Sequence, residues 1–144
     1  MTGVQTNATM IATVLPSGGS TIGANEAQLG DIYRIFVAGN FNNKGVATIT
    51  ITMFGRAQVI TLPTGMTGLK NYSLTYDCLV AAVGTSVTLF ASSTFFSGDI
   101  NHTTTVNLTG LNTVNATASS TLTMTYTAPI GNEMSVYMMY MQKI

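Results

Sequence analysis

The sequence predicts an all-β protein: one domain over residues 1–144, folded as a two-sheet antiparallel β-sandwich of the jelly-roll type with about nine strands. Apolar and polar residues alternate with a period of two in most segments, and β-branched residues are abundant, Thr alone supplying 25 of 144. Turn residues recur about every 8–15 positions. An immunoglobulin-like sandwich is the alternative, but one Cys and no Trp cannot supply the core of a true immunoglobulin domain.

The strands are expected in the following order. Residues 8–15 come first, and residues 32–41 and 46–54 then form a hairpin through Asn42-Asn43-Lys44-Gly45, because Asn and Gly tolerate the positive φ of tight turns. In the second of these strands Ile49 and Ile51 alternate with Thr50, which predicts both isoleucines in the core and Thr50 on a solvent-exposed face. Gly55-Arg56 then turns the chain. The remaining expected strands are residues 57–62, 72–83, 86–96, 103–108, 119–127 and 133–142.

The composition excludes several classes of protein. Charged residues make up 7% of the chain and the formal net charge is zero, so the clustered cations of a nucleic-acid binder are missing. A net charge near zero also favours association, which predicts an oligomer. The apolar run at residues 10–15 has no basic start and is too short for a signal peptide. The uncharged span 78–98 is interrupted by Gly, Ser and Thr, so membrane insertion is not expected.

The last expected strand is apolar on both faces. With strict alternation, the even residues from Met134 to Tyr140 share one face. The odd residues Tyr137, Met139 and Met141 share the other face, on which Ser135 is the only polar residue. One face then packs into the subunit's own core and the other against a neighbouring subunit, with internal packing on both sides as the alternative. Four of the nine methionines lie here and suit an adaptable surface. The predicted oligomer interface consists of Met134, Val136, Tyr137, Met138, Met139, Tyr140 and Met141.

Residues 20–35, Ser-Thr-Ile-Gly-Ala-Asn-Glu-Ala-Gln-Leu-Gly-Asp-Ile-Tyr-Arg-Ile, carry a family resemblance. They resemble structural proteins of tailed phages, in which a small-residue turn, Ile, Ala-Asn and Gly-Asp lead into an Arg-containing strand and a Thr-rich hairpin. The Thr-rich residues 119–127 and the terminal strand are similar in style. The resemblance implies a jelly-roll fibre, spike or capsid-type domain on a virion, commonly trimeric.

Candidate catalytic chemistry is sparse. His102 is the only histidine and Cys78 the only cysteine; a Cys–His nucleophile pair is the alternative to a buried apolar thiol and a solvated loop histidine. Zinc needs three or four clustered ligands, which this set cannot provide. Glu26 and Asp31 are the one close pair of carboxylates, and calcium binding there is the alternative to a structural role. We therefore expect no enzyme activity, no catalytic residue, no cofactor and no metal.

Asp31 and Arg34 lie within the family-like stretch. On one strand a separation of three places them on opposite faces, so they are not expected to pair with each other. We expect Asp31 to shape the turn after Gly30 and Arg34 to pair across strands, with a ligand or receptor contact as the alternative. Asn-x-Ser/Thr triplets arise by chance in a chain rich in Asn and Thr, and we expect no glycosylation at Asn7, Asn71, Asn101, Asn107 and Asn115.

The predicted function is that of a virion structural protein, a spike or fibre knob or a capsid component, acting by oligomeric assembly and surface recognition. Its expected partners are further copies of itself, first of all in a trimer, other virion proteins, and a host-surface receptor or glycan. It is expected on the particle surface or in the capsid after synthesis in the host cytoplasm. The alternatives are a non-viral carbohydrate- or receptor-binding β-sandwich and an extracellular filament subunit. The loops 63–70 and 109–118 are the expected recognition surface, with candidate residues Thr64, Met66, Leu69, Lys70, Asn112 and Asn115.

Overall fold

The computed structural model describes residues 8–9, 21–42, 45–62, 68–82, 88–97, 106–108, 117–127 and 133–144. This part of the chain consists of β-strands and turns. The strands are β1 (Ala8–Thr9), β2 (Thr21–Ile22), β3 (Ile32–Asn42), β4 (Thr48–Met53), β5 (Arg56–Thr61), β6 (Lys70–Ala82), β7 (Thr88–Ser97), β8 (Val106–Leu108), β9 (Ser120–Thr121), β10 (Thr123–Thr127) and β11 (Glu133–Lys143).

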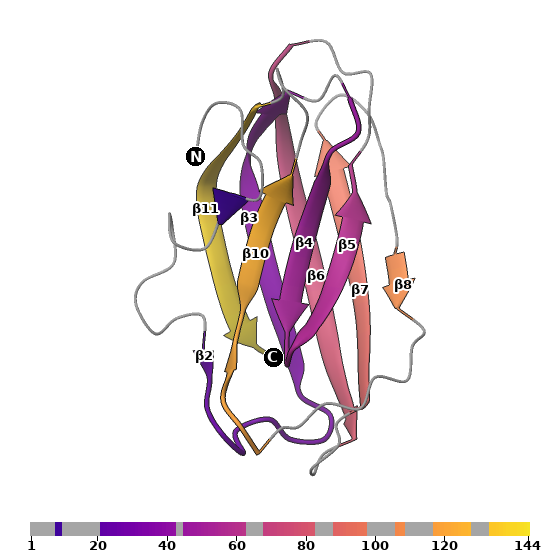
Figure 1. Ribbon diagram of the computed structural model, residues 1–144, viewed down its shortest axis with the longest axis vertical. Coiled ribbons are helices and arrows are strands. Elements are labelled where there is room, and N and C mark those ends of the chain that lie inside the picture. Colours follow the sequence, from indigo (N-terminus) through magenta and orange to yellow (C-terminus); the bar gives the residue numbers. More distant parts are fainter. Residues whose placement is uncertain are drawn as a thin grey trace.

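Two antiparallel sheets form the body of the protein, which confirms the predicted β-sandwich (Figure 1). One sheet has the order β1-β10-β4-β5 and the other the order β11-β3-β6-β7-β8, and together they hold nine strands. The short strands β2 and β9 pair separately. In the five-stranded sheet the last strand returns to lie beside the first, as in a Greek key. The jelly-roll connectivity stays a prediction.

The core lies between the two sheets. β3 alternates between buried and half-buried residues along its whole length, and β4 does the same. Ile49 and Ile51 have no exposed surface, as predicted from their alternation with Thr50. An aromatic cluster from three strands of the five-stranded sheet fills one part of the core: Phe41 meets Phe95 edge to face at 5.2 Å between ring centroids, and Tyr72 stacks on Phe95 at 5.5 Å. Each such aromatic contact stabilises by about 0.5–1.5 kcal/mol beyond simple burial.

The predicted hairpin between residues 32–41 and 46–54 is wrong. β3 pairs with β11 and β6, whereas β4 pairs with β10 and β5, so the connection between β3 and β4 crosses from one sheet to the other. Asn and Gly accept the turn conformations of a hairpin and of a crossing between sheets, and both strands alternate equally well. The local pattern therefore could not distinguish the two kinds of connection. The actual hairpin joins β4 to β5 through Phe54-Gly55, whose φ angles of 51° and 72° are those of a type I′ turn.

A β-bulge interrupts β11 between Val136 and Met138. Val136 pairs with Gly39 and Met138 with Ala38, which leaves Tyr137 as the extra residue. The alternation therefore reverses at this point, and the face assignment predicted by strict alternation is wrong beyond Val136: the even residues before the bulge and the odd residues after it face the core.

Gly39 makes the close approach of β3 and β11 at the bulge possible. A Cβ atom at this position would overlap the backbone carbonyl of Ser135 on β11. Because a backbone carbonyl within a sheet cannot move aside as a side chain can, this position accepts only glycine in the observed geometry. The bulge thus depends on a residue in the neighbouring strand.

Candidate functional site

The bulge places three large side chains of β11 on the outer surface of the five-stranded sheet. Tyr137 is 68% exposed, Met138 50% and Tyr140 39%, and we call these three residues the β11 patch. The other predicted interface residues with apolar side chains, Met134, Val136 and Met139, are buried in the core of their own subunit, and Met141 packs partly against it. The surface that β11 offers to another molecule is therefore the patch.

Neighbouring residues of β3 hold the patch in place. The ring of Tyr140 stacks on Phe36 with 5.3 Å between centroids and 22° between planes. The amide Nδ2 of Asn40 donates a hydrogen bond of 3.0 Å to the hydroxyl of Tyr137. Side chains already ordered in the free protein lose less conformational entropy on association, so this arrangement favours binding.

Arg34 and Asp77 form an ion pair beside the patch. They lie opposite each other on β3 and β6, and the guanidinium Nε and Nη2 each donate a 2.7 Å hydrogen bond to a different carboxylate oxygen of Asp77. This confirms that Arg34 pairs across strands. The carboxylate raises the pKa of Arg34. Asp77 was not identified from the sequence, although a lone carboxylate facing outward from an alternating strand is a usable signal. The pair itself carries no net charge.

Asp31 closes the turn before β3 and anchors the end of β11. Its Oδ2 accepts a 2.7 Å hydrogen bond from the backbone N–H of Gln28, which confirms the predicted role in the turn, and it also accepts one from Lys143 Nζ at 2.7 Å. Burial acts to raise the pKa of Asp31, but the hydrogen bonds from Lys143 and Gln28 outweigh it and lower the pKa overall.

The other carboxylate of the predicted pair, Glu26, has a local partner too. Its Oε2 accepts a hydrogen bond of 2.6 Å from the backbone N–H of Gly23. Glu26 and Asp31 therefore each cap a separate turn within residues 23–31. In the described parts of the chain, no three His, Cys, Asp or Glu side chains gather closely enough to hold a metal ion.

Cys78 is fully buried on the core face of β6. Burial raises the pKa of its thiol to about 12, although a hydrogen bond with Tyr76 lowers it in part. A thiol with this pKa stays protonated at neutral pH, and the protonated form is a poor nucleophile. His102, the other member of the hypothetical pair, lies outside the described residues.

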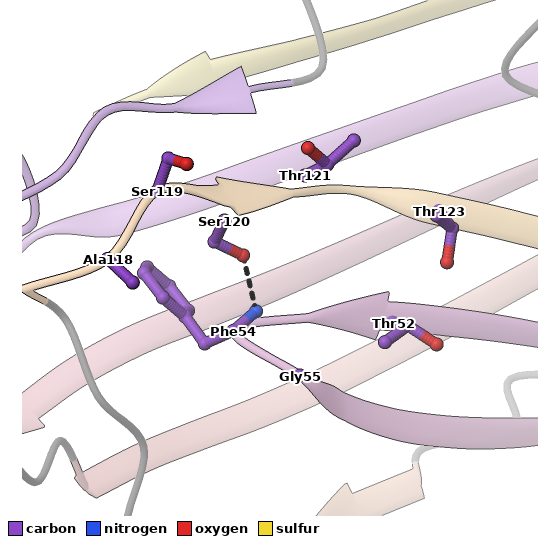
Figure 2. Close-up of a pocket in the computed structure, with 8 residues that line it drawn as sticks. All are labelled: Thr52, Phe54, Gly55, Ala118, Ser119, Ser120, Thr121 and Thr123. Carbon is purple, nitrogen blue, oxygen red and sulfur yellow. Dashed lines mark hydrogen bonds between the residues drawn. The ribbon is translucent and has the colours of Figure 1, made fainter.

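A pocket of about 380 Å³ lies where the β4–β5 turn meets β9 and β10. Figure 2 shows the hydroxyl groups of Thr52, Ser119 and Thr123 around it, with the ring of Phe54 on the side of Ala118. The lining residues that the structure describes carry hydroxyl groups that donate and accept hydrogen bonds and include no acidic or basic side chain, so the pocket suits a small polar group.

The pocket was not foreseen from the sequence because it joins residues far apart in the chain. The hydroxyl of Ser120 accepts a 2.6 Å hydrogen bond from the backbone N–H of Phe54, across 66 positions. Phe54 itself is 5% exposed and meets Tyr33 edge to face at 6.0 Å. The only local sequence signal near the pocket was the dipeptide Phe54-Gly55, which marks the β4–β5 turn.

Few of the predicted recognition residues fall in the described part of the chain. Leu69 is 53% exposed just before β6, and Lys70 is half-buried as its first residue. Thr64, Met66, Asn112 and Asn115 lie outside the described residues. Ala118 and Ser119, where the second predicted loop reaches β9, are exposed and line the pocket.

Comparison with protein-family models, with curated proteins and with solved structures finds no match to this chain. The resemblance to structural proteins of tailed phages thus stays a prediction, and the fold and its surfaces are the basis for any functional assignment. In the part of the chain that the structure describes, no helix is long and apolar enough to span a bilayer.

Proposed function

We propose that the protein is a self-assembling structural protein of a virus particle, a spike or fibre knob or a capsid component, whose subunits associate through the β11 patch. The observation that carries the proposal is the patch itself: three large, uncharged side chains exposed side by side on a rigid sheet. Tyr and Met are among the residues enriched at protein interfaces. Surface recognition through the loops at the ends of the sandwich completes the proposed role.

Three further features support this assignment. The chain has no net charge to keep its copies apart. The one ion pair described beside the patch is internally neutral, so apposed subunits would not bring unpaired like charges together there. The Ala-Asn and Gly-Asp stretch at residues 20–35 resembles phage structural proteins. These features favour a protein that works through shape and packing.

The mass of the protein in solution tests the assembly. We expect light scattering at micromolar concentration to give a multiple of the 15.1 kDa chain mass. Cryo-electron microscopy of the assembly then distinguishes a closed oligomer from an icosahedral shell or a filament. A monodisperse monomer at this concentration contradicts the proposal.

A substitution in the patch tests its location. Met138→Asp should dissociate the oligomer without unfolding the subunit, because Met138 is half exposed and points away from the core. Val59→Asp is the matched control, since Val59 is 54% exposed on the edge strand of the opposite sheet. If Val59→Asp dissociates the oligomer and Met138→Asp leaves it intact, assembly uses the other sheet.

A further inference from the structure

We propose that two copies of this chain pair antiparallel along β11, about a two-fold axis at the bulge, and join their five-stranded sheets into one continuous sheet. The inference rests on the proposed function and adds to it the pairing of strand edges, the register and the symmetry of the subunit contact. Such a contact is isologous: each copy offers the same strand to the other. It uses the backbone of the strand edge as well as the side chains of the patch.

β11 is the long open edge among the described strands. It has 11 residues and pairs on one side with β3, while no described strand lies on its other side. The edge strands β1, β5 and β8 have two, six and three residues. The charged residues of β11, Glu133 and Lys143, are at its two ends, and the stretch between them has no proline. The lysines and prolines that protect an exposed edge from pairing are therefore missing from its middle.

The bulge makes the two halves of β11 mirror each other. From residue 134 to residue 141 the side chains face core, solvent, core, solvent, and then solvent, core, solvent, core. The sequence of faces is the same in both chain directions. In an antiparallel partner each residue must face the same side of the sheet as the residue opposite it, because side chains alternate on both strands.

A second copy of β11 satisfies this condition over the whole strand. With the axis between Tyr137 and Met138, core-facing Met134 lies opposite Met141 of the second copy, and Val136 lies opposite Met139. The solvent-facing Ser135 lies opposite Tyr140, and Tyr137 opposite Met138, so the two patches meet at the axis. A thioether beside an aromatic ring adds a favourable contact of about 0.3–1.5 kcal/mol.

A regular strand from another protein fits less well. Such a strand alternates without interruption, so its side chains can match the faces of β11 on one side of the bulge only. On the other side of the bulge, its core-facing residues would lie opposite solvent-facing residues of β11. Only a strand with its own bulge at the corresponding point matches both halves. A second copy of this chain has such a strand by construction, which identifies it as the occupant of the edge.

Engineered disulfides test the register. In the proposed pairing residues 135 and 140 of different copies have Cβ atoms about 4.5–5.5 Å apart, close to the separation that a disulfide needs. The variant carrying Ser135→Cys and Tyr140→Cys should give a covalent dimer under mild oxidation as its main product. Within one copy these positions are about 17 Å apart along the strand, which prevents an internal bridge. The buried Cys78 is not accessible to either.

The variant carrying Ser135→Cys and Gln142→Cys is the matched control, since a shift of two residues moves the thiols about 7 Å along the strand and out of reach. Equal cross-linking of both variants, or of neither while the wild-type protein remains oligomeric, overturns the pairing and leaves the proposed function standing. A monomeric wild-type protein overturns both. An oligomer with an odd number of subunits, including a trimer, also contradicts a two-fold contact as its only interface.

Hydrogen exchange gives a second readout that does not depend on cysteine variants. Pairing along the edge protects those backbone N–H groups of residues 134–141 that point away from β3, so their exchange should be several-fold slower in the wild-type oligomer than in the Met138→Asp monomer. A contact made face to face through side chains alone would leave those edge groups unpaired. Unchanged exchange in this segment of an intact oligomer therefore rejects the pairing.

Discussion

Phe54 is the residue at which local strain and long-range packing meet. Its φ of 51° lies in the left-handed region, which a bulky residue rarely adopts and which costs about 1–2 kcal/mol. Burial of its ring and the hydrogen bond from its N–H to Ser120 offset this cost. The turn conformation is thus fixed by contacts with β9, far away in the chain, in addition to the flexibility of Gly55.

Replacing Ser120 should destabilise the fold through this hydrogen bond. Ser120→Ala leaves the buried N–H of Phe54 without its acceptor, and we expect a loss of about 1–3 kcal/mol in the free energy of unfolding, measured by chemical denaturation. Ser119→Ala removes an exposed hydroxyl next to it and should cost far less. Equal losses would show that the Ser120 bond does not determine the stability of the turn.

The two sides of β4 should respond differently to truncation. Ile51→Ala leaves a cavity in the core and should cost about 2–5 kcal/mol of a total stability near 5–15 kcal/mol. Thr50→Ala, one position away on the outer face, should cost less than about 1 kcal/mol. Denaturant melts of the two variants check the assignment, and a Thr50 loss as large as the Ile51 loss would contradict it.

At the scale of elements, β3 and β11 form a unit that depends on Gly39. Gly39→Ala forces a methyl group against the carbonyl of Ser135, and we expect about 1–3 kcal/mol of destabilisation together with loss of the oligomer, because the bulge that orients the β11 patch cannot form. Ala38→Val, the neighbouring half-buried position of β3, is the control and should retain the assembly. Thermal melts and light scattering measure the two effects, and an intact oligomer in Gly39→Ala would argue against the dependence.

The elements could be predicted from the sequence, but their pairing could not. Alternation located β3, β6, β7, β10 and β11 within a few residues because it reflects each strand's own exposure to core and solvent. The pairing of β4 with β10 is set by contacts far along the chain. The turn-like residues after β3 were therefore equally compatible with a hairpin and with a crossing between sheets. In the same way the bulge at Tyr137 arises from Gly39, and nothing within β11 itself marks it.

For the candidate site, the absence of a wet face on the last strand indicated an interface, which stays a prediction. Of its seven predicted residues, Tyr137, Met138 and Tyr140 are exposed, whereas Met134, Val136 and Met139 are buried in the subunit's own core. The pocket at Phe54 and the partner of Arg34 could not be predicted, because each depends on which strands become neighbours.

The whole molecule should lose stability in alkali. Burial raises the pKa of Tyr126 to about 12, and burial together with the nearby charge of Asp31 raises that of Tyr33 to about 12, against an ordinary value of 10.0. Burial also raises the pKa of Tyr72 and Tyr76. Between pH 10 and about 12 the unfolded chain releases phenolic protons that the folded protein retains, so the free energy of unfolding falls as the pH rises through this window.

Chemical denaturation at a series of alkaline pH values, followed alongside the ultraviolet absorbance of tyrosinate, measures this loss. The expected result is that the buried tyrosines ionise together with unfolding. Free ionisation of all six tyrosines near pH 10 in a still-folded protein would show that these side chains are accessible to water.

The position of β11 at the end of the strand order has a consequence for synthesis. Phe36 on β3 pairs with Tyr140 on β11, 104 positions later in the chain. β3 therefore leaves the ribosome long before β11 has been synthesised. Contacts of such large sequence separation form slowly, since the loop between them must close first. Until β11 arrives, the side of β3 that it will cover stays open and the patch is missing altogether. A nascent chain therefore cannot join its neighbours through this edge, and competence to assemble appears only once folding has reached its last described strand.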